Sequence, residues 1–206
     1  PAVYASRRRR IPMVFEVRDL WPELPIAVGA LKSPVLIALA RWLEHLAYHH
    51  SAQIVALSPG MKAGVTRRGY PPDRVHVIPN AADLDLFNAP SEAGRGFRER
   101  FDWLGNRPLV LYAGALGRIN GVDYLARLAA AAHAMDPEVR FLVLGKGAEL
   151  ERVSHEARRL AVLGRSFFML DMVPKADMPS VLSATTVATS LFVDLPEMWA
   201  NSANKF

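Results

Sequence analysis

Short apolar runs alternate with longer amphipathic stretches along most of this chain, and this alternation constrains its fold more than any other feature. Glycine, proline, asparagine or aspartate bounds each run. The runs barely alternate polar with apolar residues, as expected for strands of a parallel sheet that helices cover on both faces. The predicted strands are Met13–Val17, Gln53–Leu57, Val75–Ile78, Leu109–Tyr112, Phe141–Leu144, Phe167–Leu170 and Val187–Phe192.

The stretches between these runs carry helical periodicity. From Val35 to His50 the apolar residues recur three and four positions apart, and Ser33 followed by Pro34 is a typical helix start. Further helices are predicted over Val122–Ala134 and Ala148–Leu163, with Gly164 as the stop of the latter. Strands and helices that take turns predict an α/β fold with parallel sheets.

The regular pattern breaks between Asn88 and Arg107, where prolines and glycines flank a short mixed-charge segment. We therefore expect one domain over residues 1–87, a crossing segment over 88–106 and a second domain over 107–206. The chain opens at Pro1 without a methionine and closes at Phe206 in what reads as the opening of a helix. We expect both domains to be incomplete, as in a piece of a longer protein.

Composition limits the classes of function. Hydrophobic residues make up 51% and charged residues 22% of the 206 positions, as in a globular protein. The net charge of +5 suits anionic partners such as nucleotides, phosphates or an anionic membrane surface. The absence of cysteine excludes disulfides, thiolate metal sites and cysteine catalysis. Scattered basic residues without interleaved aromatics argue against nucleic acid as a partner.

The first candidate site follows the first predicted strand, where Glu16, Arg18 and Asp19 crowd its carboxyl end. Ligands of open α/β sheets bind at such ends. A carboxylate there, for which we name Asp19, can act as a general base toward a hydroxyl, and Arg18 can hold a phosphate or an acceptor carboxylate. A structural ion pair between Arg18 and Asp19 explains the same residues equally well.

Two glycine-rich turns after later strands are candidates for phosphate binding. The turn with Gly114, Gly117 and Arg118 lets backbone amides approach phosphate oxygens, and Arg118 adds a charged donor. Gly145 and Lys146 follow the next strand. Ordinary strand-to-helix loops and a solvated lysine remain alternatives. Neither turn has the glycine pattern of dinucleotide-binding oxidoreductases or the lysine of P-loop NTPases.

The end of the chain supplies a further anion-site candidate. Asn201 or Ser202 is a good helix cap, and the start of a helix there attracts anions. A metal site is not expected. His45 and His49 stand four apart without the glutamate and third ligand of a zinc site.

Five collinear strings, covering nearly the whole chain, resemble the retaining GT4 family of glycosyltransferases, most closely its bacterial colanic-acid or O-antigen branch. The strings are Glu16-Val17-Arg18-Asp19-Leu20-Trp21-Pro22-Glu23, Ile54-Val55-Ala56-Leu57-Ser58-Pro59-Gly60-Met61, Val77-Ile78-Pro79-Asn80-Ala81-Ala82-Asp83 with Phe87, Tyr112-Ala113-Gly114 through Asn120-Gly121, and Asn201-Ser202-Ala203-Asn204-Lys205-Phe206.

The resemblance implies a GT-B fold, in which two Rossmann-like domains face a cleft, the first binding the acceptor and the second the nucleotide-sugar. By the same resemblance the turn at Gly114 faces the donor diphosphate, and the turn at Met172-Val173 offers backbone groups to the base, so Val173 is assigned to the donor. Asn80 is assigned to the acceptor side of the cleft. The final string adds Ser202, Asn204 and Lys205 to the residues that face the diphosphate.

The chain departs from the family pattern at three positions. Many members carry an arginine directly after the first glycine of the turn and a lysine before the later one, where this chain has Ala115 and Asn120. Arg118 is the nearest substitute for the phosphate clamp, and Asn120 is kept as a donor-site candidate. Many members also have a histidine at the position of Arg18.

We expect a hexosyltransferase-like enzyme that moves a sugar, with retention, from a UDP- or similar nucleotide-sugar to a lipid-linked or saccharide acceptor in cell-surface polysaccharide synthesis. It is expected to need no cofactor and no metal, and to work in the cytoplasm or peripherally at the inner membrane face. Two alternatives stay open: a non-catalytic remnant that binds a membrane or partner through basic patches, and a nucleotide-sugar epimerase of the same architecture.

Overall fold

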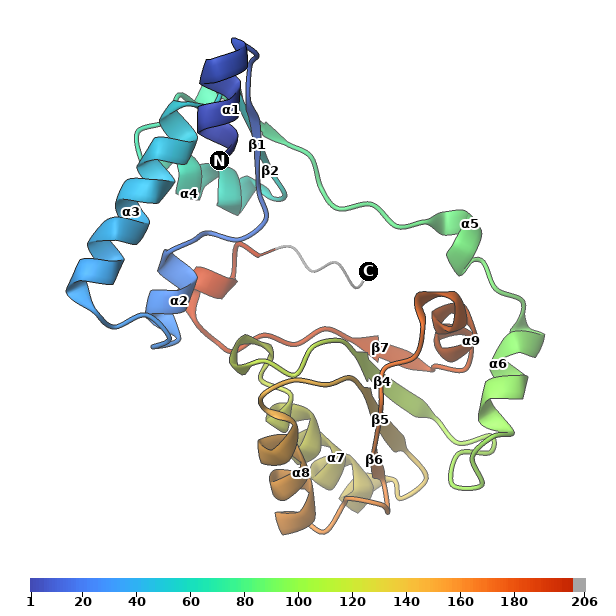
Figure 1. The fold of residues 1–206 in the computed structure, drawn as a ribbon. Helices are drawn as coiled ribbons and strands as arrows, with labels where there is room; N and C mark the ends of the chain where they lie inside the picture. Colours follow the sequence, from blue (N-terminus) through green and yellow to red (C-terminus); the bar gives the residue numbers. More distant parts are fainter. Residues whose placement is uncertain (202–206) are drawn as a thin grey trace. The chain divides into compact units, whose positions relative to one another are not determined.

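The structure, a computed structural model, describes residues 1–201 and divides them into two compact units (Figure 1). Unit 1 comprises residues 1–81 together with the described residues from 194 onward, and unit 2 comprises residues 82–193. Each unit contains its own parallel sheet with helices packed against it. The expected α/β class is therefore confirmed.

Unit 1 is built on a sheet of three parallel strands in the order β1-β2-β3. Its elements are α1 (Ala2–Arg9), β1 (Val14–Val17), α2 (Glu23–Ala27), α3 (Pro34–His49), β2 (Gln53–Ala56), α4 (Pro59–Arg67), the 3-10 turn η1 (Pro72–Arg74), β3 (Val75–Val77) and the 3-10 turn η4 (Pro196–Met198).

The core of unit 1 forms where β2 meets its helices. Ile54 on β2 is fully buried and packs with Met61 and Val65 of α4 and with Tyr48 of α3. The α4 helix begins where the Ser58 hydroxyl accepts a hydrogen bond of 3.1 Å from the Met61 amide, which satisfies one of the free donors of the first turn. This cap fixes the direction in which the chain leaves β2.

The last described residues return to unit 1. The Ser58 hydroxyl donates to the carbonyl oxygen of Ala200, and Ala200 packs against the core of the unit. A Cβ placed on Gly60 in α4 would lie 2.8 Å from the Ala200 Cβ, so the glycine permits this close approach. A segment that lies more than a hundred residues further along the chain therefore completes unit 1.

Unit 2 is built on a sheet of four parallel strands in the order β6-β5-β4-β7. Its elements are α5 (Leu84–Phe87), α6 (Ser91–Arg98), β4 (Leu109–Ala113), the 3-10 turn η2 (Arg118–Asn120), α7 (Asp123–Met135), β5 (Arg140–Leu144), α8 (Leu150–Arg159), β6 (Phe167–Leu170), the 3-10 turn η3 (Lys175–Asp177), α9 (Met178–Ser183) and β7 (Val187–Thr189).

Helices cover both faces of the unit 2 sheet, as Figure 1 shows. On one face Tyr112 and Phe141 pack with Leu125 of α7 and Val153 of α8. On the other face leucines of β4 and β5 pack with residues of α6 and α9. The β5 strand is buried along its whole length, which explains its unbroken apolar sequence.

The division into units differs from the expected boundaries at 87 and 106. The chain passes into unit 2 after Ala81, and residues 88–106 are part of that unit. The Arg98 side chain donates to the carbonyls of Gly105 and Arg107, each at 2.8 Å, and to Ala184 at 2.5 Å. These bonds fasten α6 to the loop before β4 and to the end of α9, so the segment that reads as a crossing contains a packed helix.

The predicted strands all exist, whereas several helices differ. The β7 strand ends at Thr189 rather than at Phe192, and α8 ends at Arg159 rather than at Leu163. The α8 helix stops before Gly164 because Ala161 takes a left-handed conformation, with φ of 54°. Helices α1, α2, α4, α5 and α9 had no counterpart among the expected elements.

Candidate functional site

The topology of unit 2 identifies one place on its sheet where a ligand fits best. The chain adds β5 and β6 on one side of β4 and then returns to the other side as β7. In open α/β sheets, ligands bind at the carboxyl ends of the strands where the order reverses, here between β4 and β7. The Val193 amide donates to the Ile119 carbonyl at 2.9 Å, so the loops after these two strands lie side by side.

Two glycine-rich turns interlock at this edge. The Gly114 amide donates to the Leu144 carbonyl at 2.9 Å, and the Leu116 amide donates to the Lys146 carbonyl at 3.0 Å. A Cβ on Gly145 would lie 2.0 Å from the Gly114 carbonyl oxygen, so no other residue fits there without moving the backbone. The sequence candidates Gly114, Gly145 and Lys146 are thus brought together, with the Lys146 side chain exposed.

The turn continues into η2, where the Asn120 side chain has a structural role. Its oxygen accepts a hydrogen bond of 3.2 Å from the Gly117 amide, and the residue is only 8% exposed. Asn120 therefore closes the turn that presents Arg118. The Arg118 side chain is 69% exposed, and its Nε lies 3.8 Å from a carboxylate oxygen of Glu149.

Val173 lies after β6, two strands away from β4 in the sheet. It is half-buried against the α6 and α9 face and lines a cavity of about 260 Å³ with Phe97, Arg100 and Asp177. Ser202, Asn204 and Lys205, the remaining donor-site candidates, lie outside the described residues.

Unit 1 holds the second group of candidates in one pocket. Glu16, Arg18 and Asp19, at the carboxyl end of β1, line a cavity of about 250 Å³ together with Trp21. Arg18 pairs with Glu16, its Nε lying 3.6 Å from Oε1, rather than with Asp19 as the structural interpretation of the sequence expected. Partial desolvation raises the pKa of the Asp19 carboxyl above its ordinary value, and the charge of Arg18 opposes this shift.

Asn80 belongs to the same edge of the unit 1 sheet. It follows β3 by three residues, and since β1, β2 and β3 are parallel, their carboxyl ends meet there. The residue is half-buried.

The far wall of the pocket contains a buried polar group that the sequence did not reveal. Glu44, on α3, is 7% exposed and lines the cavity with Tyr48. Arg68 lies between two carboxylates, with its Nε 3.3 Å from Glu44 and its terminal nitrogen paired with Glu23. Burial raises the pKa of Glu44, and Glu23 adds repulsion that Arg68 partly offsets. The helical pattern placed Glu44 on an exterior face, so no sequence signal marked it.

Among residues 1–201, no group of three or more histidine, aspartate or glutamate residues is placed to hold a metal ion. None of the helices described there is long and apolar enough to cross a membrane.

Comparisons with known proteins give related sequences for both units. Residues 1–81 match a family model described as "Glycosyl transferase 4-like domain". The chain is 34% identical over 195 residues to alpha-maltose-1-phosphate synthase of Mycolicibacterium smegmatis, covering 89% of this chain and 48% of that protein. It is 31% identical over 111 residues to alpha-D-kanosaminyltransferase of Streptomyces kanamyceticus, covering 53% of this chain and 28% of that protein.

Solved structures share the fold at low identity. Anabaena Alr3699/HepE, crystallised with UDP and glucose, matches with a TM-score of 0.73 and 20% identity over 92% of this chain and 49% of that one. The glycosyltransferase WaaG, involved in lipopolysaccharide biosynthesis, matches with a TM-score of 0.67 and 14% identity over 88% and 51% of the two chains. The chain spans about half the length of the first of the curated relatives and of these solved structures.

Proposed function

We propose that the whole protein transfers a sugar from a nucleotide-sugar to an acceptor hydroxyl, because this chain belongs to the GT4 family of glycosyltransferases and has the α/β units of the GT-B fold. The names of the curated relatives and the UDP and glucose bound to a structural neighbour support this class of reaction. Retention at the sugar carbon and a role in cell-surface polysaccharide synthesis, at the cytoplasmic face of the membrane, are part of the proposal.

The donor diphosphate is assigned to the interlocked turns of unit 2, and this geometry is the observation that carries the proposal. The close approach of Gly114 and Gly145 joins the two turns at the switch point of the sheet. The amides of Gly114, Gly117 and Gly145 already donate within the protein, so the diphosphate is assigned to neighbouring amides of the turns, such as those of Ala115 and Lys146. Arg118 supplies a charged donor, and Lys146 adds positive charge beside it. Asn120 supports the turn and Val173 contacts the base. Ser202, Asn204 and Lys205 are assigned to the same diphosphate.

Catalysis then depends on stabilising the leaving group. The bond between the sugar carbon and the diphosphate oxygen breaks, and the electron pair leaves with the diphosphate, whose growing charge Arg118 and the turn amides stabilise. The acceptor oxygen forms the new bond to the sugar carbon, and its proton passes to Asp19. The raised pKa of Asp19 suits a base that must hold a proton, and Arg18 orients the acceptor.

The pocket of unit 1 is proposed as the acceptor site. Glu16 and Asn80 are assigned to the acceptor rather than to the donor. Three carboxylates and the exposed ring of Trp21 surround this cavity. Carboxylates accept hydrogen bonds from hydroxyl groups, which suits a saccharide or the sugar portion of a lipid-linked acceptor.

Arginine substitution in the whole protein tests the donor assignment. A charge-assisted hydrogen bond contributes about 1.5–3 kcal/mol, so Arg118→Ala is expected to weaken donor binding roughly 10- to 150-fold and to lower turnover. Arg158→Ala is the matched control, because Arg158 is an exposed arginine on α8. Equal effects of the two substitutions would refute the assignment of Arg118.

The same assay separates transfer from epimerisation. A radiolabelled nucleotide-sugar is incubated with the protein in the presence and absence of a bacterial membrane lipid and oligosaccharide extract. Transfer requires the extract and moves label into it. Conversion of the labelled donor to its epimer without any extract would support the epimerase instead.

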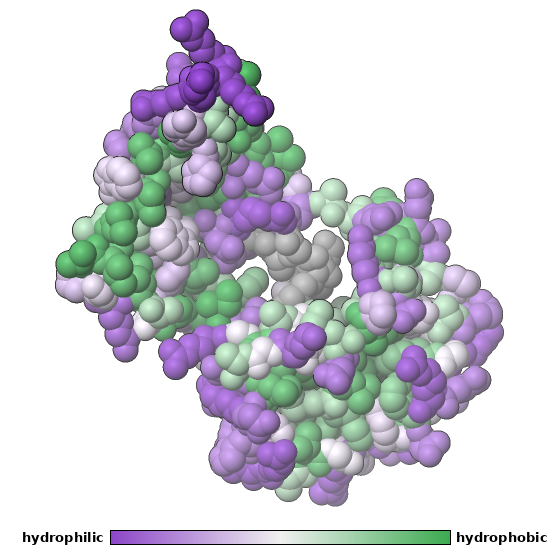
Figure 2. All heavy atoms as spheres, in the orientation of Figure 1, coloured by the Kyte–Doolittle hydropathy of each residue, from purple (hydrophilic) through white to green (hydrophobic). Residues whose placement is uncertain are grey.

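A membrane-bound function is the second candidate, and two surfaces of unit 1 favour it. Four exposed arginines, Arg7 to Arg10, lie at the end of α1, and Figure 2 shows the hydrophilic cluster over that helix. Apolar atoms gather over α3 in the same view, where exposed large side chains line one end of the helix: Val35, Leu36, Leu39, Trp42 and Leu43. A basic patch and an apolar helix face on the same unit are typical of proteins that bind anionic lipid surfaces.

Sedimentation with vesicles tests this candidate. The whole protein should sediment with vesicles that contain anionic lipid and remain in solution with neutral ones, and replacing Arg7 to Arg10 by glutamine should reduce the bound fraction. Sedimentation without any sugar transfer would favour the non-catalytic membrane-binding alternative.

A further inference from the structure

We infer that Glu149 is a positioning residue for the donor: it holds Arg118 at the glycine-rich turn before the diphosphate arrives. This inference rests on the proposed function, because it assumes that Arg118 binds the donor. Glu149 follows the turn after β5 and precedes α8, and none of the sequence arguments gave it a role.

The pair between Arg118 and Glu149 joins an exposed side chain to a shielded one. The Arg118 side chain is 69% exposed, whereas that of Glu149 is 15% exposed. The Glu149 backbone amide donates to the Leu116 carbonyl at 3.0 Å, which ties the residue to the turn that carries Arg118. The long side chain of Arg118 is therefore the part of the pair that can move.

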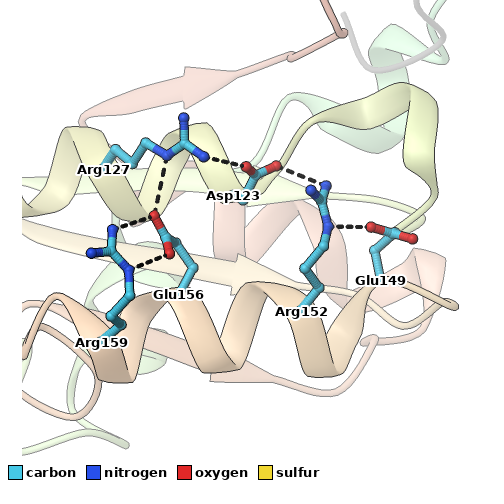
Figure 3. Close-up of polar contacts among 6 residues, drawn as sticks. All are labelled: Asp123, Arg127, Glu149, Arg152, Glu156 and Arg159. Atoms are coloured by element: carbon cyan, nitrogen blue, oxygen red, sulfur yellow. Dashed lines mark hydrogen bonds and ion pairs between the residues drawn. The ribbon is translucent and has the colours of Figure 1, made fainter.

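A series of alternating charges fixes the Glu149 carboxylate (Figure 3). Arg152 pairs through Nε with Glu149 and through its terminal nitrogen, at 2.9 Å, with Asp123, whose side chain is 8% exposed. Asp123 also accepts from Arg127 at 3.1 Å. Asp123 of α7 thus fixes the Arg152 side chain of α8, and Arg152 in turn fixes the Glu149 carboxylate.

The strengths of these contacts decide how the pair behaves. The distance of 3.8 Å and the exposure of Arg118 make its ion pair weak, as exposed pairs usually are. A diphosphate with several charges can therefore draw Arg118 away from Glu149. Because Glu149 keeps its partner Arg152, no carboxylate is left unpaired next to the bound anion.

The benefit to the donor lies in preorganisation. Without Glu149, Arg118 samples many rotamers in solvent, and binding must restrict them at a cost in entropy. With Glu149 in place, the guanidinium already lies beside the two turns. Glu149 should therefore affect donor binding only through Arg118.

A double-mutant cycle in the whole protein tests this dependence. The probes are uridine diphosphate, other nucleoside diphosphates and inorganic pyrophosphate, with binding measured by calorimetry. Glu149→Gln is expected to weaken binding roughly two- to fivefold, the range that an exposed ion pair allows. In an Arg118→Ala background the same substitution should have no further effect. In turnover assays Glu149→Gln should raise the donor KM and leave kcat nearly unchanged.

Two further variants complete the design. Glu156→Gln is the matched control, because Glu156 is equally shielded, at 15% side-chain exposure, and lies at the far end of the charge series, where it pairs with Arg127 and Arg159. It should leave diphosphate binding unchanged. Arg152→Gln frees Glu149 without removing it, and should weaken binding only while Arg118 is present. This second variant keeps the test open if Glu149→Gln does not fold.

Two results would overturn the inference. An equal loss from Glu149→Gln with and without Arg118 would mean a structural role, and tighter binding would mean that Glu149 repels the donor. If the unmodified protein bound none of the nucleoside diphosphates or pyrophosphate, the proposed function itself would fail first. The binding of the unmodified protein thus distinguishes failure of the function from failure of the role of Glu149.

Discussion

Glu44 keeps an ionisable carboxyl buried in unit 1, and burial raises its pKa above the ordinary 4.5. A carboxyl with a raised pKa binds its proton more tightly in the folded state, so its contribution to stability is lost as the pH rises above 4.5. Glu44→Gln keeps the shape without the charge. We expect this variant to melt about 1–4 °C higher than the parent at pH 7, with the gain shrinking at pH 4.

Thermal melts at the two pH values measure this effect, with Glu16→Gln as the control because Glu16 is exposed. A lower melting temperature for Glu44→Gln at pH 7 would mean that the pair with Arg68 outweighs the cost of burying the charge.

Glycine substitutions test the interlocked turns of unit 2. Gly145→Ala places a Cβ within 2.0 Å of a backbone oxygen and should destabilise unit 2 by more than about 2 kcal/mol. Gly96→Ala is the control: nothing lies within 4 Å of its Cβ position in α6, so it should stabilise by roughly 0.5–1 kcal/mol. Urea unfolding measures both. Similar stability for the two variants would contradict the close approach of the turns.

Sequence patterns marked some residues of the candidate site and could not mark others. Glu16 at the end of a predicted apolar strand, and Arg18, Asp19 and the turn residues just after such strands, were marked by this pattern. The structure places all of them at the carboxyl ends of strands. Glu44 and Glu149 stood out in no pattern, because a helical glutamate normally faces solvent. Their importance comes from partners far along the chain, such as Arg68, which no local pattern contains.

The α7 and α8 pair is held in part by ion pairs that acid should break. Hydrogen bonds from Arg159 and Arg127 lower the pKa of Glu156 to about 2, from an ordinary 4.5. A carboxyl with a lowered pKa contributes stability above 4.5 and loses it as the pH falls toward 2. Glu156→Gln should therefore lower the melting temperature at pH 7, and the difference from the parent should diminish between pH 4.5 and 2.

Melts of parent and variant across this pH range provide the test. Arg158→Gln is the control, because it changes an exposed arginine of α8 and removes no carboxyl, so it should show no such convergence. A constant difference between parent and Glu156→Gln down to pH 2 would contradict the assigned pKa.

Elements with an unbroken run of apolar residues could be predicted from the sequence. Elements that depend on contacts with distant residues could not. All seven strands were found from their composition. The α4 helix was missed because Gly60 and Gly64 lower its helical propensity, and both glycines are explained only by tertiary packing: a Cβ on Gly64 would lie 2.7 Å from Leu20, and Gly60 faces Ala200. The α1 helix buries none of its residues, so no apolar stripe marked it.

At the scale of the whole molecule, the chain enters unit 2 after Ala81 and returns to unit 1 at Asp194. The family resemblance gave the two Rossmann-like units correctly. The sequence pattern could not show that residues beyond 193 belong with the first unit, because that return depends on contacts between distant residues, such as those of Ala200 with Ser58 and Gly60.

Enlarging that glycine tests the return. Gly60→Leu should push Ala200 away and destabilise unit 1 by about 1–3 kcal/mol. Hydrogen exchange should show lost protection in α4 and β2, while β4 and β5 keep theirs. Lys62→Leu, on the same helix, is the control. Unchanged protection of α4 in Gly60→Leu would show that residue 200 does not pack there.

The central claim is that a diphosphate binds at the glycine-rich turns of unit 2. The most direct measurement is hydrogen exchange of the whole protein with and without saturating nucleoside diphosphate, tested with each of the common bases. We predict slower exchange at residues 114–121 and 145–149, reduced by Arg118→Ala. Slower exchange confined to other segments, with these two turns unchanged by every nucleotide that binds, would contradict it.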